Sequence, residues 1–154
     1  ARPTEIDPMT TIHQLLQNKA PDVWTIAPTD KVFHALELMA EKNIGALPVV
    51  ENGRVCGIFS ERDYARKVVL HGRSSRDTPI ADIMTAQVIS VRPQEGMSRC
   101  MALMTDKHIR HLPVLDDNEQ LIGIISIGDV VKAIIAEQQI LIDHLQDYIT
   151  GSHG

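Results

Sequence analysis

The hydrophobic positions change their spacing in a readable order along the first half of the chain. A short apolar run from Val23 to Ile26, soon followed by Pro28, predicts a strand. Apolar residues then recur at i, i+3, i+4, i+7 and i+8, which is the spacing of an amphipathic helix. The residues with this spacing are Val32, Ala35, Leu36, Met39 and Ala40. The pattern therefore predicts a strand followed by a helix.

Two further apolar runs surround a turn signal. The runs 47–50 and 55–59 flank an Asn-Gly dipeptide, which strongly favours a two-residue β-hairpin turn. Ser60 then begins a predicted helix that continues to about Leu70. Its expected core positions are Tyr64, Ala65 and Val68. The first half of the chain thus has the order β-α-β-β-α.

The same order returns in the second half. The segment from Val88 to Ile135 can be laid over the segment from Val23 to Val69 with one extra residue in a turn, and Leu112-Pro113-Val114 then falls on Leu47-Pro48-Val49. This self-similarity indicates an internal duplication. The sequence therefore predicts an α/β fold of the α+β kind, built from two β-α-β-β-α repeats.

The repeats divide the chain into four segments. These are the first repeat with its lead-in helix (11–70), a polar linker (71–79), the second repeat (80–136) and a C-terminal helical extension with a tail (137–154). A unit below about 60 residues buries too little surface to fold alone, so the repeats are expected to share a core. An approximate two-fold axis would relate them and leave two equivalent clefts.

Composition and charge exclude several classes of function. A formal net charge of −5 and 3% aromatic residues oppose nucleic-acid binding, which needs basic and stacking surfaces. The chain has no apolar run long enough to span a bilayer, and its first ten residues do not resemble a signal peptide, so the predicted location is cytoplasmic. Cys56 and Cys100 lie in apolar patterns and are interpreted as core residues.

One motif occurs in both repeats. Ser60 and Asp63 follow a glycine-led apolar strand, and Ser126 and Asp129 do the same in the second copy. Serine with an acid three residues later is close to a capping box, so a purely structural role is one interpretation. The other is ligand binding. The unpaired N–H groups at a helix start favour a phosphate, an aspartate can accept from both ribose hydroxyls, and the preceding glycine allows a ligand to approach the strand.

Taken together, these features resemble the CBS (cystathionine-β-synthase) domain pair, or Bateman module, of the stand-alone bacterial type. The resemblance covers about Ile12 to Ile135 and rests on the duplication, the lead-in Asp82-Ile83-Met84-Thr85, the Leu-Pro-Val strand and the repeated motif. It implies a regulatory module without catalytic activity or catalytic cofactor, binding an adenosyl ligand in each cleft. The ligands open at this point are AMP, ADP, ATP, NAD and S-adenosylmethionine. The motif aspartates would hold ribose and the serines would lie near phosphate.

Other residues are candidates for the same sites. Arg62 lies inside the first motif, although a solvated helix face is the alternative interpretation. Arg110 and His111 stand where family members often place phosphate-binding residues, whereas the first copy has neutral residues there, so the two sites are expected to differ. Thr25 and Thr85 occupy positions where the family often contacts adenine or phosphate, and a packing role is an equal alternative for them.

Catalysis and metal binding have less support from the sequence. The chain lacks the nucleophile elbow, Walker and dinucleotide-binding motifs of common enzymes, so it is not predicted to be an enzyme. The pair His108 and His111 spans a helix-to-strand break, so no metal site is predicted. The main alternative is a structural dimerisation module with empty clefts.

Assembly is expected to involve the C-terminal extension. Ile134, Leu141 and Tyr148 recur at seven-residue spacing with Leu145 between the last two, which predicts a helical stripe that either folds back or meets a partner helix. Because CBS pairs typically form disc-like dimers through their helices, the resemblance implies a homodimer that includes this extension and both motif helices. With no effector domain in the sequence, a signal is expected to pass through that interface or to an unidentified protein partner.

Overall fold

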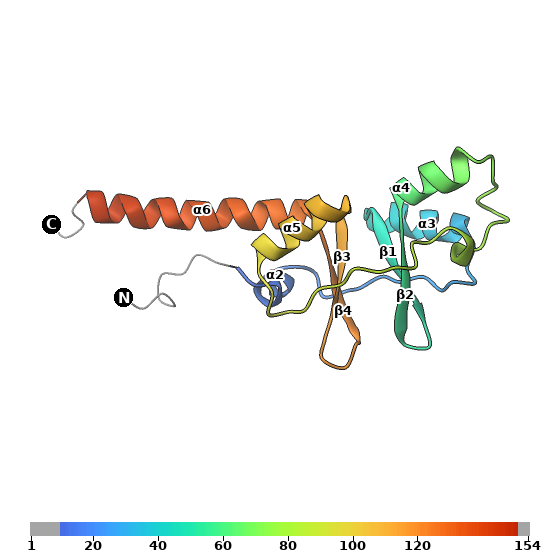
Figure 1. Ribbon diagram of the computed structural model, residues 1–154, viewed down its shortest axis with the longest axis horizontal. Coiled ribbons are helices and arrows are strands. Elements are labelled where there is room, and N and C mark those ends of the chain that lie inside the picture. Colours follow the sequence, from blue (N-terminus) through green and yellow to red (C-terminus); the bar gives the residue numbers. More distant parts are fainter. Residues whose placement is uncertain (1–9, 151–154) are drawn as a thin grey trace. The chain divides into compact units, whose positions relative to one another are not determined.

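The computed structural model describes residues 10–150, and the tail of the predicted extension, 151–154, lies outside them. Figure 1 shows the β-hairpins and the helices that accompany them. The helices are α2 (Ile12–Gln17), α3 (Val32–Lys42), α4 (Glu61–Asp63), α5 (Met97–Lys107) and α6 (Ile127–Ile149), with a π-helical segment η1 (Tyr64–Val69) and a 3₁₀ turn η2 (Ile80–Asp82). The strands are β1 (Ala46–Glu51), β2 (Arg54–Ser60), β3 (His111–Leu115) and β4 (Leu121–Ser126).

The chain forms two compact units. The first-motif unit contains Asp22–Ser90 and Pro113–Ile124. The described residues of the second-motif unit are 10–21, 91–112 and 125–150. Each unit therefore carries one copy of the Ser-x-x-Asp motif.

The hairpin predicted from the Asn-Gly dipeptide is confirmed. Strands β1 and β2 pair antiparallel from Ala46 opposite Ser60 to Glu51 opposite Arg54. The two turn residues, Asn52 and Gly53, both have positive φ, at 53° and 77°. Positive φ at both central residues defines the turn whose twist matches that of the flanking strands.

The first predicted strand is reduced to a single bridge. Ile26 alone pairs in parallel with Val49, donating its N–H to Pro48 O at 3.1 Å and accepting from Val50 N at 2.9 Å. Trp24 and Thr25 are exposed, so only Ile26 of this run belongs to the core. The predicted strand was therefore too long, because the apolar run includes side chains that face solvent.

The helix predicted from Ser60 to about Leu70 begins as predicted but changes its winding. After the three residues of α4, η1 winds more loosely, and Leu70 N–H donates to Ala65 O, five residues earlier, at 3.2 Å. Looser winding changes which side chains face inward. Val68 is buried as predicted, whereas Tyr64 is only half-buried and Ala65 is exposed, so the prediction of Ala65 as a core residue is wrong.

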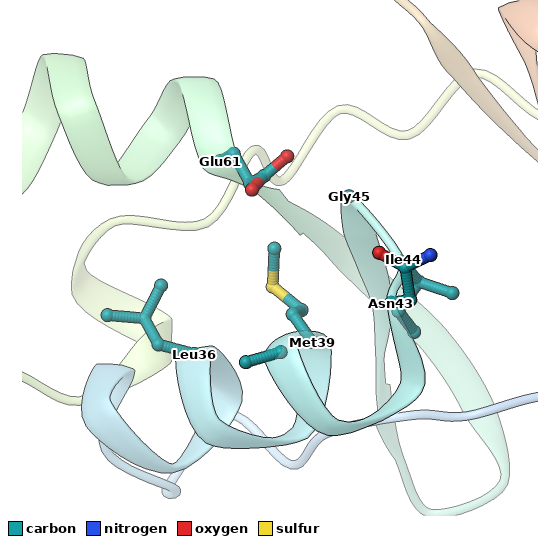
Figure 2. A pocket seen from close by; sticks show the side chains of 7 residues that line it. Leu36, Met39, Asn43, Ile44, Gly45 and Glu61 are labelled. Carbon is teal, nitrogen blue, oxygen red and sulfur yellow. The ribbon is translucent and has the colours of Figure 1, made fainter.

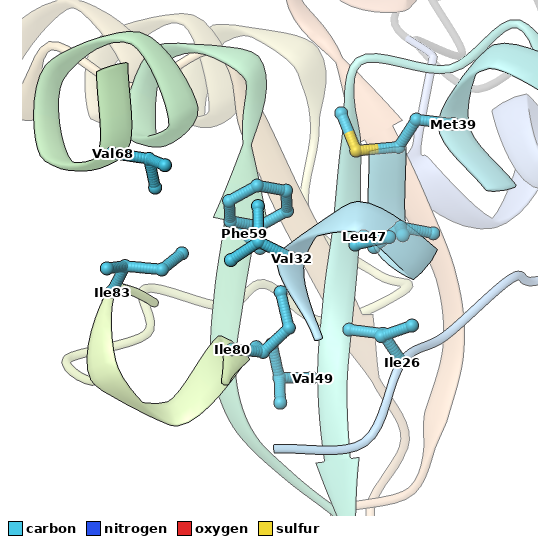
Figure 3. Close-up of a cluster of buried hydrophobic side chains, with 10 residues drawn as sticks. Ile26, Val32, Met39, Leu47, Val49, Phe59, Val68, Ile80 and Ile83 are labelled. Atoms are coloured by element: carbon cyan, nitrogen blue, oxygen red, sulfur yellow. The ribbon is translucent and has the colours of Figure 1, made fainter. Parts of the chain in front are cut away.

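The core of the first-motif unit gathers around Phe59. In Figure 3, Val68 and Ile83 lie on one side of the Phe59 ring, with Leu47 and Ile26 on the other. Ile80 and Ile83 join this core, although the sequence places them in the lead-in to the second repeat. Their segment is fixed by backbone bonds, including Ile80 N–H to Asp30 O at 2.8 Å.

The lead-in to the first repeat behaves in the reciprocal way. Helix α2 lies in the second-motif unit, where Ile12 N–H donates to Glu95 O at 2.8 Å and His13 N–H to Pro93 O at 2.8 Å. Ile12 and Leu15 are buried. The repeats in the sequence and the units in space therefore differ, because each lead-in segment packs with the other copy of the repeat.

Helix α6 joins two segments that the sequence pattern separates. It continues without a break from the second motif through the predicted boundary near residue 136 to Ile149. Glu137, just past that boundary, is buried and accepts the Thr10 N–H at 2.6 Å. The C-terminal extension is thus a direct continuation of the motif helix.

The two cysteines are free thiols. Cys100 is fully buried in α5, and burial raises the pKa of its thiol to about 11. Cys56 is only half-buried. The structure therefore confirms Cys100 as a core residue and places Cys56 at the edge of the core.

Candidate functional site

The first motif forms a complete capping box. Ser60 is the N-cap of α4, its Oγ accepts the Asp63 N–H at 3.2 Å, and its own N–H donates to Asp63 Oδ2 at 3.0 Å. Reciprocal bonds of this kind satisfy backbone donors that a helix start leaves unpaired. The structural interpretation of the motif is therefore confirmed for this copy.

The second oxygen of Asp63 is available for different partners. Lys67, one turn later, places Nζ 3.1 Å from Asp63 Oδ1, and Thr85 Oγ1 donates to the same oxygen at 3.3 Å. Asp63 is only 9% exposed. The structure thus brings together three of the predicted site residues, Ser60, Asp63 and Thr85, and adds Lys67, which is not among the predicted site residues.

Lys67 is tied to more than the aspartate. Its ammonium also donates to Ile83 O at 3.2 Å and lies 3.4 Å from Thr85 Oγ1. The three acceptors come from two separate segments of the first-motif unit. Lys67 therefore fastens the motif helix to the lead-in segment that follows it in the sequence.

The remaining candidates of this copy lie differently. Arg62 is half-buried beside Asp63 in α4. Thr25 is exposed, and among the described residues its side chain makes no hydrogen bond with Ser60 or Asp63. The prediction of Thr25 as a binding residue stays a prediction.

Gly57 serves a different purpose from the one expected. A Cβ atom at Gly57 would lie 2.5 Å from Met84 Sδ and 3.1 Å from Thr85 O. Ile58 and Thr85 exchange both backbone hydrogen bonds, at 3.0 and 2.9 Å. The space beside this glycine is therefore taken by the chain itself, which corrects the expectation that the glycine admits a ligand at this position.

The second motif repeats the capping box on a much longer helix. Ser126 is the N-cap of α6, its N–H donates to Asp129 Oδ2 at 2.8 Å, and its Oγ accepts the Asp129 N–H at 3.2 Å. The same carboxylate oxygen lies 2.7 Å from Lys19 Nζ. A lysine thus neutralises the aspartate in both motifs, but here it comes from the distant lead-in segment.

Arg110 and His111 adjoin this second motif. Ile127 N–H donates to Arg110 O at 2.8 Å, which joins the start of α6 to the start of β3. Burial lowers the pKa of His111, with Lys19 and Arg110 lowering it further against the opposing effect of Asp129. The structure therefore brings together Ser126, Asp129, Arg110 and His111, as the sequence predicted.

Asp129 keeps its charge. Burial alone would raise its pKa, but hydrogen bonds from the Lys19 ammonium and from Ser126 outweigh that effect and hold the pKa below its usual value. The second motif therefore presents a charged carboxylate beside a lysine, an arginine and a neutral histidine at pH 7.

His111 is expected to make the fold sensitive to mild acid. Because its pKa is lowered in the folded chain, the unfolded chain takes up the proton first, and stability falls as pH drops below the ordinary value of about 6.5. The variant His111→Asn should show a smaller decrease in unfolding temperature between pH 7.5 and 5.5. Asp129, whose pKa is lowered from its usual value, stays ionised in both the folded and the unfolded chain over this range and contributes nothing there.

Thermal denaturation across this pH range checks the prediction, with His34→Asn as the matched control at an exposed position. Equal acid sensitivity in the wild type and the His111 variant would contradict it.

A cavity of about 370 Å³ lies on another part of the first-motif unit. It is lined by Leu36, Met39, Ala40, Asn43, Ile44, Gly45 and Glu61. Figure 2 shows the α3 side chains on one side and Glu61, from the motif helix, on the other. No predicted site residue lines this cavity, and sequence reasoning missed it. The sequence feature that could have indicated this cavity is the apolar face of α3. One residue of that face, Ala40, is exposed and so is not needed for the core.

Two kinds of feature were sought in the part of the chain that the structure describes: clustered metal-binding side chains and membrane-spanning helices. Residues 10–150 contain no group of three histidine, cysteine or acidic side chains suited to a metal ion. Within the same residues, no helix has the length and apolar character needed to cross a membrane.

Comparison with known proteins relates this chain to proteins with CBS domains. A family model for the CBS domain matches residues 6–70 and 80–136. The CBS domain-containing protein CBSX3, mitochondrial, from Arabidopsis thaliana is 42% identical over 153 residues, covering 94% of this chain and 74% of the plant protein. A solved protein with CBS domains from Burkholderia ambifaria MC40-6 is 52% identical, with a TM-score of 0.79, covering 84% of this chain and 96% of that chain.

The fold also matches a structure with bound ligands. The CBS domain pair of protein MJ0100, solved in complex with 5′-methylthioadenosine and S-adenosyl-L-methionine, has a TM-score of 0.72 at 23% identity, covering 82% of this chain and 97% of that chain. The family model covers both sequence repeats, each with its own copy of the Ser-x-x-Asp motif. The chain therefore belongs to the CBS domain family and carries a tandem pair of these domains.

Proposed function

We propose that the chain is a regulatory module that binds an adenosyl ligand at each of its two motifs and catalyses no reaction. The observation that carries the proposal is that the two Ser-x-x-Asp motifs repeat one geometry. In each, an aspartate caps a helix start through one oxygen while a lysine neutralises the carboxylate. A capping role alone does not require that a lysine neutralise the aspartate in both motifs.

The chemistry of the aspartates suits a ribose. A carboxylate offers several lone pairs, and a pair of neighbouring hydroxyls can take over those that the cap does not use, which Lys67 and Thr85 hold in the first motif. The candidates remain AMP, ADP, ATP, NAD and S-adenosylmethionine, which share the adenosine. At the level of the fold, the MJ0100 complex supports ligands of this class.

The two sites are proposed to be unequal. The second motif has Arg110, His111 and Lys19 around Asp129, whereas the residues that correspond to Arg110 and His111 in the first copy are the neutral Gly45 and Ala46. One ligand with two affinities, or two different ligands, is the expected consequence.

A thermal-shift series tests ligand binding. A ligand at about 100 times its dissociation constant adds about 2.7 kcal/mol of stability, which raises the unfolding temperature by about 5 to 10 °C for a domain of this size. AMP, ADP, ATP, NAD and S-adenosylmethionine are compared, with guanosine monophosphate as the control. No shift with any adenosyl ligand at millimolar concentration would favour the alternative, a structural dimerisation module.

The output is proposed to pass through a homodimer or to a protein effector. Helix α6 exposes a row of large apolar side chains beyond the second motif, and it begins at the very residues that would hold the ligand. We expect a second copy of the chain to cover this row. The helix that follows the first motif is proposed to belong to the same interface.

The predicted cytoplasmic location stays a prediction, since the Arabidopsis relative is described as mitochondrial.

A further inference from the structure

The aspartate of the first motif has a donor on every acceptor position. Asp63 Oδ2 accepts the N–H of Ser60 at 3.0 Å and the hydroxyl of the same serine at 3.1 Å. Asp63 Oδ1 accepts the Thr85 hydroxyl at 3.3 Å and lies 3.1 Å from the Lys67 ammonium. Because a carboxylate offers about four lone pairs, these four donors saturate Asp63.

The aspartate of the second motif is only partly occupied. Asp129 Oδ2 accepts the Ser126 N–H at 2.8 Å and lies 2.7 Å from the Lys19 ammonium. Within residues 10–150, no hydrogen bond ends on Asp129 Oδ1. No buried side-chain oxygen or nitrogen in that range lacks a partner, so this oxygen is open to solvent. Asp129 therefore keeps one oxygen for an incoming ligand.

The two donors on Asp63 Oδ1 are held in place by contacts of their own. Lys67 also donates to Ile83 O at 3.2 Å, and the backbone of Thr85 exchanges both hydrogen bonds with Ile58, at 3.0 and 2.9 Å. A ribose gains Asp63 Oδ1 only by displacing side chains that are anchored in this way. Hydrogen bonds to a charged carboxylate are among the stronger ones, so the displacement opposes binding.

We propose that Thr85 and Lys67 close the first motif to ribose by taking the positions of its two hydroxyls, so that an adenosyl ligand binds the second motif in preference. Thr85 is then a specificity-determining residue that competes with the ligand for Asp63. The two copies of the motif differ in hydrogen-bond saturation as well as in charge. This inference rests on the proposed function, since it assumes that the motif aspartates accept ribose.

The experiment measures how strongly each motif depends on the ribose hydroxyls. AMP and 2′-deoxy-AMP are compared by titration calorimetry on the full chain, because the phosphate is common to both and cancels from the ratio of their dissociation constants. Asp63→Asn weakens the first motif, and Asp129→Asn weakens the second. We expect the intact second motif to prefer AMP by at least about tenfold and the intact first motif by less than about threefold.

The variant Thr85→Val tests the competition itself. In the Asp129→Asn background, it frees a lone pair on Asp63 Oδ1 and is expected to raise the preference of the first motif for AMP by at least about threefold. A residue that contacts the ligand would instead lose affinity when its hydroxyl is removed. Thr85→Ser keeps the hydroxyl and should retain the low preference. Thr78→Val is the matched control, because Thr78 is a buried threonine of the same unit whose hydroxyl donates to Ser74 O at 2.6 Å.

The outcomes separate the inference from the proposed function. Equal preferences for AMP at the two motifs would overturn the inference, as would an unchanged first motif in Thr85→Val. If thermal denaturation shows that Thr85→Val does not fold, Lys67→Met in the same background must raise the preference, or the inference fails. A chain that binds neither nucleotide at millimolar concentration would also overturn it, whereas the proposed function fails only if no adenosyl ligand of the thermal-shift series binds.

Discussion

The substitutions Asp63→Asn and Asp129→Asn are each expected to weaken adenosyl-ligand binding at the altered motif by at least about tenfold. Charge-assisted hydrogen bonds are worth about 1.5 to 3 kcal/mol each, and the amide loses both the charge and one acceptor oxygen. Asparagine still has an oxygen that can accept the N-cap N–H of Ser60 or Ser126. The variant therefore separates ligand binding from the capping role that the structure shows.

Calorimetry with AMP measures the loss, and thermal denaturation verifies that each variant remains folded. Asp82→Asn is the matched control, because Asp82 is an acid of the first-motif unit paired with Arg73 at 3.1 Å, at a distance from the motif in the sequence. The proposal of ribose binding would be abandoned if both motif variants bound AMP as tightly as the control.

Ser60→Ala and Ser126→Ala should mainly lower the free energy of unfolding, by about 1 kcal/mol each.

Local signals made much of the fold predictable. The Asn-Gly turn, the apolar spacing of α3 and the Ser-x-x-Asp caps each depend on neighbouring residues, and each appears where the sequence placed it. The capping geometry in particular follows from two side chains three residues apart. For this reason the core of each candidate site, the serine and the aspartate, could be read from the chain.

Contacts between distant segments were not predictable in the same way. Lys19 and Asp129 are 110 positions apart, and nothing in the local pattern of either residue indicates the ion pair. The exchange of the lead-in segments has the same cause, since Ile12 and Ile80 are ordinary apolar residues whose packing partners are set by the tertiary fold. The looser winding of η1 likewise leaves no clear trace in the sequence of Tyr64–Val69.

The apolar face of α6 could be predicted only in part. The sequence indicated a stripe through Ile134, Leu141, Leu145 and Tyr148, whereas the structure shows a second row, which shares Leu145 with that stripe and has alternating spacings of four and three residues. This row consists of Val131, Ile135, Gln138, Ile142, Leu145 and Ile149. Its five apolar members are between 39% and 76% exposed. Such spacing is that of a coiled-coil seam, and the polar Gln138 within it would favour one register.

The double substitution Ile142→Asp and Leu145→Asp is expected to convert a homodimer into a monomer. Both side chains are about half exposed in the single chain, at 45% and 52%, so their replacement should cost the folded monomer little. In a dimer with this row at the interface, the new carboxylates would lose their hydration without a partner, which is strongly unfavourable. Light scattering at micromolar concentration should therefore give about half the mass of the unmodified protein.

A matched change on another face of α6 distinguishes this effect from a general effect of added acid. Ala136 is exposed and lies about 120° around the helix from Ile142, since each residue turns the helix by about 100°. Ala136→Asp should leave the dimer intact. A monomeric unmodified chain, with and without AMP, would refute the homodimer, and a dimer that survives both aspartates would place the interface elsewhere. Because α6 begins at Ser126 and Asp129, loss of the dimer should also alter AMP affinity at the second motif if the ligand signals through this helix.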